Sequence, residues 1–431
     1  MKVAEFFAQY KFSPDVDIEA LLVEFNSQMD AGLAGKGKSL AMIPAYVDVD
    51  KSVPTDSPII VLDAGGTNLR VAVIWFDQAG KRHVEDFQKF AMPGTAGAKQ
   101  LSPEEFFAKF AEFLEPVCKR ADNVGFCFSY ATEITPSLDG KLLRWTKQVN
   151  APGVVGKMVG SGIANALKKK TGRKLGIRVL NDTVATLLAG KSAGISRQYS
   201  SYVGFILGTG TNIAYIESNP NIKKLKKLDP ARTMVINVES GNFNGAPAST
   251  FDTLFDKTTA DPGIGLFEKM ISGAYIGGVG LTLLKCAAKE GFFSKAATTA
   301  ILKLKELSTK DFDDFVANPF TRGSAFDGIK FTDKDRRTLM DLSEPLFIRA
   351  AKLTAANIAV AVLRSGAGHD KLHPVCVTVD GSTYFKTRSV FFKSRVEAAL
   401  RDILESRGVF FETISVEDAP MVGSAVAGLI V

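Results

Sequence analysis

The sequence predicts an α/β protein with two lobes. Apolar runs of strand character alternate with helical stretches along the chain, which is typical of this fold class. The 431 residues far exceed the ~150 of an average domain, so several domains or one large two-lobed unit are expected. The tripeptide Gly-Thr-Asn occurs twice between strand-like runs, at 66–68 and 210–212, and this echo favours a duplicated lobe.

The elements follow in order along the chain. Residues 17–32 repeat apolar side chains at helical spacing after the start signal Ser13-Pro14, and residues 48–58 form a polar linker. Strands at 59–62 and 69–74 flank a glycine-rich turn and make a hairpin. The remaining expected elements are a second hairpin at 205–216, a strand at 377–379, helices at 104–113, 184–189 and 354–365, and a loop-rich region at 223–270.

Composition excludes several classes of function. The 53 Lys and Arg against 46 Asp and Glu give a net charge of +7, which suits an anionic small molecule as readily as a nucleic acid. The 4 scattered cysteines are too few for a disulfide framework or a four-cysteine zinc site, and they indicate a reducing compartment. Only His83, His369 and His373 are present, which nearly excludes a mechanism that depends on histidine.

The ends of the chain predict a cytoplasmic protein. The N-terminus has no sustained apolar stretch of the kind found in secretory signals. We expect no membrane partner, since no run approaches the ~18 apolar residues of a membrane span. The apolar C-terminus, 425–431, is expected to be a helix packed in the core.

Three features imitate other sites. Residues 32–39 fit the pattern G-x-x-x-x-G-K-S, but a helix rather than a strand precedes them, so a helix end and loop are expected. The lysines at 168–170 have no interleaved aromatic residues, so a solvated helix end is favoured over a nucleic-acid site. His369 and His373 stand four apart without an apparent third ligand, and a loop is favoured over a metal site.

The two glycine-rich turns, at 65–67 and 208–211, suit phosphate binding. Glycine lets backbone N–H groups approach an anion closely, and threonine adds a hydroxyl donor. Asp63, at the end of the first strand, could hold Mg²⁺ through water, and Arg70 could neutralise phosphate charge. Ordinary hairpin turns are the alternative for either turn alone, and the matching pair favours phosphate.

At this point seven ordered motifs resemble those of the hexokinase family, over nearly the whole chain. Residues 62–70 and 206–212 resemble its two phosphate motifs, 125–129 with 145–147 its sugar-binding segment, 181–183 its base motif, 237–239 and 267–273 its sugar-contacting Glu segments, and 380–384 its adenosine motif. The resemblance implies the two-lobed actin-like ATPase (ribonuclease H-like) fold with a deep interlobe cleft. It also implies ATP-dependent phosphorylation of a hexose, glucose foremost, at the 6-hydroxyl, with Mg²⁺.

The resemblance also implies the site residues. For the sugar they are Ser129, Thr146, Lys147, Asn181, Asp182, Asn212, Glu239 and Glu268. For the nucleotide they are Asp63, Gly65, Gly66, Thr67, Asn68, Arg70, Gly208, Thr209, Gly210, Asp380, Gly381 and Ser382, with Asp63 as the Mg²⁺ residue acting through water. Taken singly, Glu239 and Glu268 would more often be solvated surface acids.

Asp182 is the expected general base. It follows an apolar strand at 177–180 and precedes a helix, which places it at the sheet edge where α/β folds usually present ligands. On local sequence alone, residues 181–183 would more often only cap that helix. The resemblance reverses this preference, and the scarcity of histidine agrees with a carboxylate base.

The chain departs from the family pattern beside its contact residues. Phe-Pro after Ser129 becomes Tyr130-Ala131, and Gly-Phe after 145–147 becomes Gln148-Val149. Trp-Gly after Glu239 is replaced by Ser240-Gly241. Near the C-terminus, where the family has a glycine-rich basic stretch, this chain has APMVGSA at 419–425. The polar contact residues persist, so we expect retained hexose phosphorylation with altered sugar selectivity and nucleotide contacts.

The resemblance implies a division into two lobes that close on the sugar. The small lobe is expected at 59–182 plus 419–431 and the large lobe at 1–58 plus 183–418, in a monomer or homodimer whose partners are a hexose and Mg-ATP, with no nucleic acid. The alternatives are a repressor-type sugar kinase, an actin-like assembly protein and a catalytically inactive sugar sensor. The first usually carries a Cys-rich zinc motif, the second has no need of a sugar set, and the third would be expected to have lost Asp182, Asp63 or a phosphate glycine.

Overall fold

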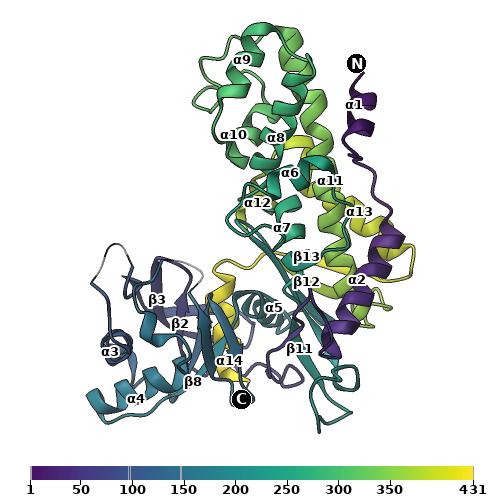
Figure 1. Cartoon of the computed structure of the whole chain (residues 1–431). Helices are drawn as coiled ribbons and strands as arrows, with labels where there is room; N and C mark the ends of the chain where they lie inside the picture. Colours follow the sequence, from purple (N-terminus) through teal and green to yellow (C-terminus); the bar gives the residue numbers. More distant parts are fainter. Residues whose placement is uncertain (1, 96, 98, 146–147, 431) are drawn as a thin grey trace.

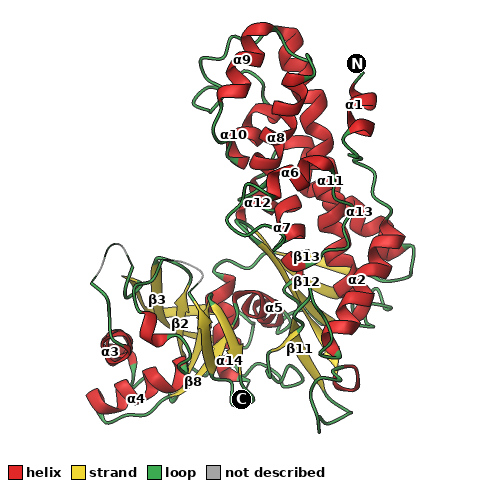
Figure 2. Cartoon of the chain, in the orientation of Figure 1, coloured by secondary structure: helices red, strands yellow, loops and turns green. Residues whose placement is uncertain are grey.

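The protein consists of two mixed β-sheets joined by a pair of central helices (Figure 1). This computed structural model describes residues 2–95, 97, 99–145 and 148–430. One sheet with helices α3 and α4 forms one side of the molecule, and a longer, mainly helical body stands on the other sheet (Figure 2). The α/β class predicted from the sequence is confirmed.

The first sheet has five strands in the order β4-β3-β2-β5-β8. Strands β2, β3 and β4 are antiparallel neighbours, whereas β5 and β8 run parallel to β2. The strands are β2 (Ile59–Ala64), β3 (Asn68–Phe76), β4 (Arg82–Ala91), β5 (Asn123–Phe128) and β8 (Gly176–Leu180), with a separate hairpin of β6 (Ala131–Ile134) and β7 (Gly140–Arg144).

The second sheet repeats this arrangement. Its order is β1-β11-β10-β9-β12-β13, with β9, β10 and β11 antiparallel and β12 and β13 parallel to β9. The strands are β1 (Ile43–Pro44), β9 (Ser201–Leu207), β10 (Thr211–Ser218), β11 (Thr233–Asn237), β12 (Val375–Asp380) and β13 (Phe411–Ile414). The two Gly-Thr-Asn turns join equivalent strand pairs, β2–β3 and β9–β10, so the repeated tripeptide marks a repeated topology.

Helices cover both sheets. They are α1 (Val3–Gln9), α2 (Ile18–Leu33), α3 (Pro103–Leu114), α4 (Val159–Thr171), α5 (Asp182–Ala193), α6 (Thr250–Asp256), α7 (Leu266–Ile271), α8 (Ile276–Lys289), α9 (Lys295–Lys303), α10 (Thr309–Ala317), α11 (Asp333–Arg364), α12 (Ser382–Lys386), α13 (Phe392–Glu405) and α14 (Ala419–Leu429). Each long helix buries an apolar face: α3, for example, packs Phe106 and Phe110 into the core of the first sheet.

Two helices, α5 and α14, form the seam between the sheets. Helix α5 packs on β9 and β12, while α14 packs on β2 and β5 and also along α5. A Cβ atom on Gly423 would lie 1.7 Å from the carbonyl oxygen of Ala185, and one on Gly125 would lie 1.7 Å from that of Ser424. Helix α14 is therefore wedged against both neighbours at backbone contact distance, and the expected buried C-terminal helix is confirmed.

Helix α11 corrects one expectation. It is long and apolar enough to cross a membrane by length and composition, contrary to the expectation that no such segment exists. However, 83% of its qualifying window is buried inside the structure, as in the central helix of a packed core. Residues such as Phe347 and Leu353 are fully buried there. The helix predicted at 354–365 covers only the last part of α11.

Other local expectations are met or adjusted. The segment at 32–39 is the end of α2 followed by a loop, as expected, and the lysines at 168–170 form the exposed last turn of α4. Helix α2 begins after Asp17, whose side chain accepts a hydrogen bond from the Ala20 backbone, so the start signal at Ser13 was placed too early. Helix α1 was missed, and the region 223–270 contains β11, α6 and α7 besides its loops.

The seam generates a stability prediction. Replacing Gly423 by Ala should cost about 3 kcal/mol of unfolding free energy, because the methyl group would meet a backbone carbonyl that cannot move aside cheaply. Gly291→Ala is the control: its surroundings are open, so only the positive φ is penalised, by about 1–2 kcal/mol. Urea unfolding measures both. An equal decrease in the free energy of unfolding in the two variants would contradict the close packing of α14.

Candidate active site

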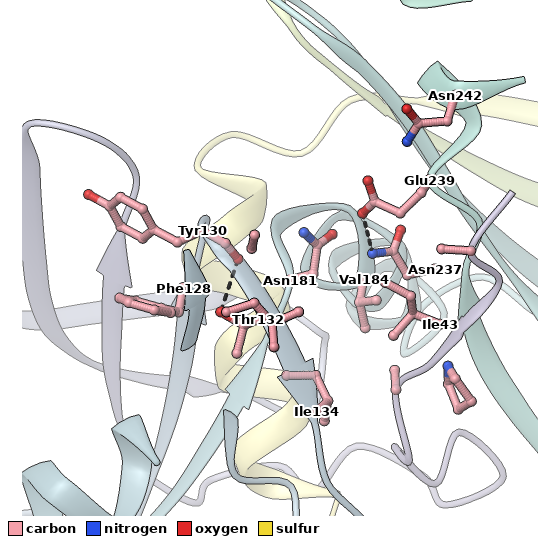
Figure 3. A pocket seen from close by; sticks show the side chains of 15 residues that line it. Ile43, Phe128, Tyr130, Thr132, Ile134, Asn181, Val184, Asn237, Glu239 and Asn242 are labelled. Atoms are coloured by element: carbon pink, nitrogen blue, oxygen red, sulfur yellow. Dashed lines mark hydrogen bonds between the residues drawn. The ribbon is translucent and has the colours of Figure 1, made fainter. Parts of the chain in front are cut away.

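A cavity of about 220 Å³ opens between the two sheets (Figure 3). Phe128, Tyr130 and Thr132 line it from the β5–β6 side. Asn237 and Glu239 line it from the other sheet, and the start of α5 lies between the two sides. The cavity thus combines an apolar wall with convergent amide and carboxylate groups, a composition suited to a small polyhydroxylated ligand.

The start of α5 contributes Asn181 and Asp182. Asn181 is the N-cap, and its side chain accepts a hydrogen bond of 2.8 Å from the Thr183 backbone. Asp182 is the first helical residue, and its carboxylate accepts a hydrogen bond of 3.3 Å from the Thr183 hydroxyl. The capping role that local sequence favoured therefore belongs to Asn181, which leaves the Asp182 carboxylate at the positive end of the helix.

Glu239 is held by two amides. Asn237 and Asn212 each donate a hydrogen bond to its Oε1, at 2.8 Å and 3.3 Å. Asn212 also donates to Asn237, at 2.7 Å, so the three side chains form one network. The Glu239 backbone is left-handed, with φ 59° and ψ 47°, an uncommon conformation for a non-glycine residue that often marks functional positions.

Glu268 lies against the second glycine-rich turn, at 208–211. Its Oε2 accepts a hydrogen bond of 2.9 Å from the Thr211 backbone N–H. A Cβ atom on Gly210 would lie 2.5 Å from that oxygen, so glycine is needed there for the carboxylate to approach. Burial is the main cause that raises the pKa of both Glu268 and Glu239, and each pKa is raised further by a neighbouring carboxylate.

Asp63 lies at the end of β2, beside the first phosphate loop. It is buried, and Arg70 on β3 pairs with it through Nε at 2.8 Å and through a second nitrogen. Arg70 also pairs with Asp418, at the start of α14, at 2.7 Å. Burial raises the pKa of Asp63, although Arg70 opposes the shift. Arg70 is thus held between two carboxylates rather than pointing freely toward a phosphate.

The charge of Asp182 acts on two neighbouring carboxylates. Burial raises the pKa of Asp63 and of Glu239, and the charge of Asp182 adds to both shifts. The Cys127 thiol, fully buried at the end of β5, has a pKa raised by burial and then by Asp63 and Asp182. Its sulfur lies 3.7 Å from the Ser129 hydroxyl. Asp63 and Cys127, on the neighbouring strands β2 and β5, therefore lie within reach of the charge of Asp182 at the start of α5.

A second cavity, of about 440 Å³, lies beside the second phosphate loop. Thr209, Ser382 and Lys386 are among its lining residues. The turn at 380–382 approaches the loop so closely that a Cβ on Gly381 would lie 2.4 Å from the Leu207 carbonyl, and Gly381 has φ +111°. Thr383 donates a hydrogen bond of 2.8 Å to the Gly208 carbonyl. The turns at 208–210 and 380–383, both predicted to bind the nucleotide, therefore lie against each other.

The predicted set divides into three groups. Asn181 and Glu239 line the interlobe cavity, and Asp182, Asn212, Glu268, Ser129 and Asp63 lie in the segments around it without lining it. Thr209 and Ser382 line the second cavity, and Gly208, Gly210, Asp380 and Gly381 belong to the two turns beside it. The first loop carries Gly65, Gly66, Thr67, Asn68 and Arg70 between β2 and β3. Thr146 and Lys147 lie outside the described residues.

Sequence reasoning missed several side chains of the site. Asn237 was part of a quoted motif but was not singled out, although an amide next to a buried carboxylate is a natural partner for it. Thr132 and Asn242 line the interlobe cavity without any motif signal. Asp418 reaches Arg70 from 348 positions along the chain, a contact that no local pattern reveals.

Within the described residues, no group of three or more His, Cys, Asp or Glu side chains could hold a metal ion by itself. A Mg²⁺ ion bound mainly by nucleotide phosphates and water needs only one or two protein carboxylates, so Asp63 fits the smaller requirement.

Comparisons with known proteins agree with this geometry. Two family models described as hexokinase match residues 2–192 and 202–430. Hexokinase-2 of Candida albicans is 31% identical over 97% of this chain and 89% of its own length. Hexokinase-7 of Oryza sativa subsp. japonica is 31% identical over 91% of this chain and 88% of its own length.

Solved structures give the same result. A hexokinase from Schistosoma mansoni complexed with glucose matches with a TM-score of 0.75 and 25% identity, over 99% of this chain and 98% of that one. A ROK hexokinase from Thermus thermophilus matches with a TM-score of 0.50 and 17% identity, over 86% of this chain and 97% of that one, a likeness of fold alone. The predicted two-lobed actin-like ATPase fold is confirmed.

The half-buried carboxylate of Glu239 predicts that the stability of the fold falls as the pH rises. Because burial raises the folded-state pKa of Glu239 above its unfolded value of 4.5, the native state binds more protons between the two pKa values, and stability falls as pH rises through that window. Glu239→Gln removes this penalty. Its melting temperature should exceed that of the wild type at pH 8, and the difference should shrink toward pH 4.5.

The matched control is Glu405→Gln, at an exposed position on α13. Calorimetric melting temperatures of all three proteins between pH 4.5 and pH 8 decide the matter. A Glu239→Gln protein that melts below the wild type at pH 8 would show that the charged carboxylate is stabilising, contrary to this account.

Proposed function

The chain belongs to the hexokinase family and is an ATP-dependent hexose kinase, and from this premise we propose that Asp182 is the general base for transfer to the 6-hydroxyl of glucose. The observation that carries the proposal is the position of Asp182 as the first residue of α5, next to Asn181, which lines the interlobe cavity. The charge of Asp182 also helps to raise the pKa of Asp63 and of Glu239. The relatives are named as hexokinases and lend no support to an inactive sugar sensor.

Phosphoryl transfer requires positioning and charge neutralisation more than covalent chemistry by the protein. Asp182 would accept the proton of the sugar 6-hydroxyl while the oxygen of that hydroxyl bonds to the γ-phosphorus of ATP. ADP would leave with the electron pair of the bond that breaks between the γ-phosphorus and the bridging oxygen. A carboxylate is suited to this role because it needs to hold the proton only briefly as the alkoxide is captured. The three histidines lie outside this group of residues.

The hexose is proposed to bind in the interlobe cavity. A neutral sugar with many hydroxyl groups is best held by side chains that each pair with one or two of them. Asn181, Asn212, Glu239 and Glu268 offer such groups from the α5 and large-lobe side. Ser129 offers one from the small lobe, and Thr146 and Lys147 are proposed to do the same.

ATP is proposed to lie across the two phosphate loops, with its nucleoside in the second cavity. There Thr209 and Ser382 provide hydroxyl groups, and Lys386 a positive charge. Mg²⁺ bound to the phosphates would neutralise their charge, and Asp63 would hold one of its water ligands. Arg70 orients Asp63 through their ion pair.

The division into a small lobe, 59–182 plus 419–431, and a large lobe, 1–58 plus 183–418, is proposed to allow closure. Each lobe carries one phosphate loop, so approach of the lobes brings the donor and the acceptor together and excludes water as a competing acceptor. We place the reaction in the cytoplasm, in a monomer or homodimer, with no nucleic-acid or membrane partner; these four points stay predictions.

A panel of hexoses with Mg-ATP tests the substrate assignment. The expected result is formation of ADP with the highest kcat/KM for glucose, and ³¹P–¹H correlation spectra should place the phosphate on the 6-oxygen of the product. Phosphate on another oxygen, or a better substrate among mannose, fructose and galactose, would contradict the assignment.

Replacement of Asp182 by Asn tests the base. The variant keeps the size of the side chain, so it should fold normally and bind glucose within about tenfold of the wild type, whereas kcat should fall about 10²–10⁴-fold. Asp341→Asn, at an exposed position on α11, is the control and should keep wild-type turnover. Turnover by Asp182→Asn within tenfold of the wild type would exclude the proposed role.

A further inference from the structure

The second cavity lies between two helices from separate parts of the chain. Helix α10 lines one side of it, with Thr309 and Lys310 among its residues, and the short helix α12 lines another, with Ser382 and Lys386. The second glycine-rich turn lines the cavity through Thr209. Helix α12 has only 5 residues, too few to be stable by itself, so contacts with its neighbours must hold this side of the cavity in place.

The two ends of α12 are held by different neighbours. Near its start, the Thr383 hydroxyl donates a hydrogen bond of 2.8 Å to the Gly208 carbonyl. Beyond its end, the Asp313 carboxylate on α10 accepts hydrogen bonds from the backbone N–H groups of Arg388, at 3.1 Å, and Ser389, at 2.8 Å. The Ser389 hydroxyl donates in return to the Asp313 backbone carbonyl, at 3.0 Å. Asp313 and Ser389 are both buried, so these bonds are sheltered from water.

The segment that Asp313 holds continues into a strained turn. Val390 and Phe391 both have positive φ, 53° and 54°. This conformation is costly for residues with a Cβ atom, above all for a β-branched valine, and Phe391 is 79% exposed, so burial of its ring offers no compensation. Such strain persists only where neighbouring contacts impose it, and it is common beside ligand sites. The bonds to Asp313, and one of 2.6 Å from the Arg395 Nε to the Val390 carbonyl, are contacts of that kind.

We infer that Asp313 is a positioning residue for the nucleotide, because it joins the end of α12 to α10 and so sets the width of the cavity between them. Two backbone N–H groups already engage its carboxylate, so it acts through Lys386 and Thr387, the cavity residues next to the bonded segment. Without the carboxylate the strained turn would relax, and the nucleotide would have to order this wall as it binds, which costs affinity. The inference rests on the proposed function, since it needs the nucleoside of ATP in the second cavity.

Steady-state kinetics of Asp313→Ala test the inference. The KM for Mg-ATP should rise about five- to thirtyfold, as for the loss of hydrogen bonds to a buried charged group. The kcat and the KM for glucose should stay within about threefold of the wild type, because the interlobe site is unchanged. A residue that only supports the fold would not produce this split between the KM for one substrate and kcat.

The matched control is Asp335→Ala. Asp335, on α11, is also a buried aspartate, and its carboxylate accepts hydrogen bonds from the backbone N–H groups of Ser294, at 2.7 Å, and Thr332, at 2.9 Å. It ties the start of α9 to the start of α11 and is not among the residues that line either cavity. Both variants should lower the free energy of unfolding in urea, but only Asp313→Ala should raise the KM for Mg-ATP.

A second variant, Ser389→Ala, decides the matter if Asp313→Ala does not fold. It removes only the hydroxyl that donates to the Asp313 carbonyl, so the KM for Mg-ATP should rise about two- to fivefold, with kcat unchanged. An unchanged KM in the variants that fold would overturn the inference. So would an equal rise in Asp335→Ala, or a fall in kcat as large as the rise in KM.

The wild-type enzyme separates failure of the inference from failure of the proposed function. If the wild type phosphorylates glucose with Mg-ATP and the variants show any of these contrary results, only the role of Asp313 is overturned. If the wild type forms no ADP with any hexose, the proposed function is overturned, and the inference with it.

Discussion

The close packing of α14 between α5 and β5 is the constraint on which the site depends. At Gly423 and Gly125 the backbones approach so closely that a single methyl group would not fit. This contact joins the two sheets at one seam and fixes where α5 begins. Asp182 opens that helix, and Asp418, just before α14, reaches Arg70 and through it Asp63. The position of the proposed base is therefore set by backbone contact rather than by a mobile loop.

The site gathers three carboxylates that are wholly or partly removed from water. Asp63 is buried and Glu239 and Glu268 are half-buried, and burial raises the pKa of each. Amide donors, a backbone N–H and an arginine offset only part of the cost of keeping these charged groups away from water. This pattern is expected where a preorganised polar site lowers the stability of the fold. A sugar with several hydroxyl groups would supply donors to the same oxygens. The unusual backbone of Glu239 agrees with a residue placed for binding rather than for packing.

Much of this arrangement could be predicted from the sequence, because it is encoded locally. The two glycine-rich turns lie between apolar strands, and the structure places them at equivalent points of two matching sheets. The remainder depends on contacts between distant segments. The link from Asp418 to Arg70 and the hydrogen bond from Tyr130 to Gly66 join residues without a shared motif. Helix α1 was missed because its 7 residues gain their stability from Phe6 and Phe7, which are buried by other segments.

The most direct measurement is a crystal structure with glucose and a non-hydrolysable ATP analogue bound together. If Asp182 is the base, the oxygen of the glucose 6-hydroxyl should lie about 2.6–3.2 Å from a carboxylate oxygen of Asp182 and face the γ-phosphorus. Glu239 and Glu268 should each accept a hydrogen bond from another hydroxyl of the same sugar. A sugar whose 6-hydroxyl faces a different side chain, with Asp182 beyond hydrogen-bonding distance, would contradict the account.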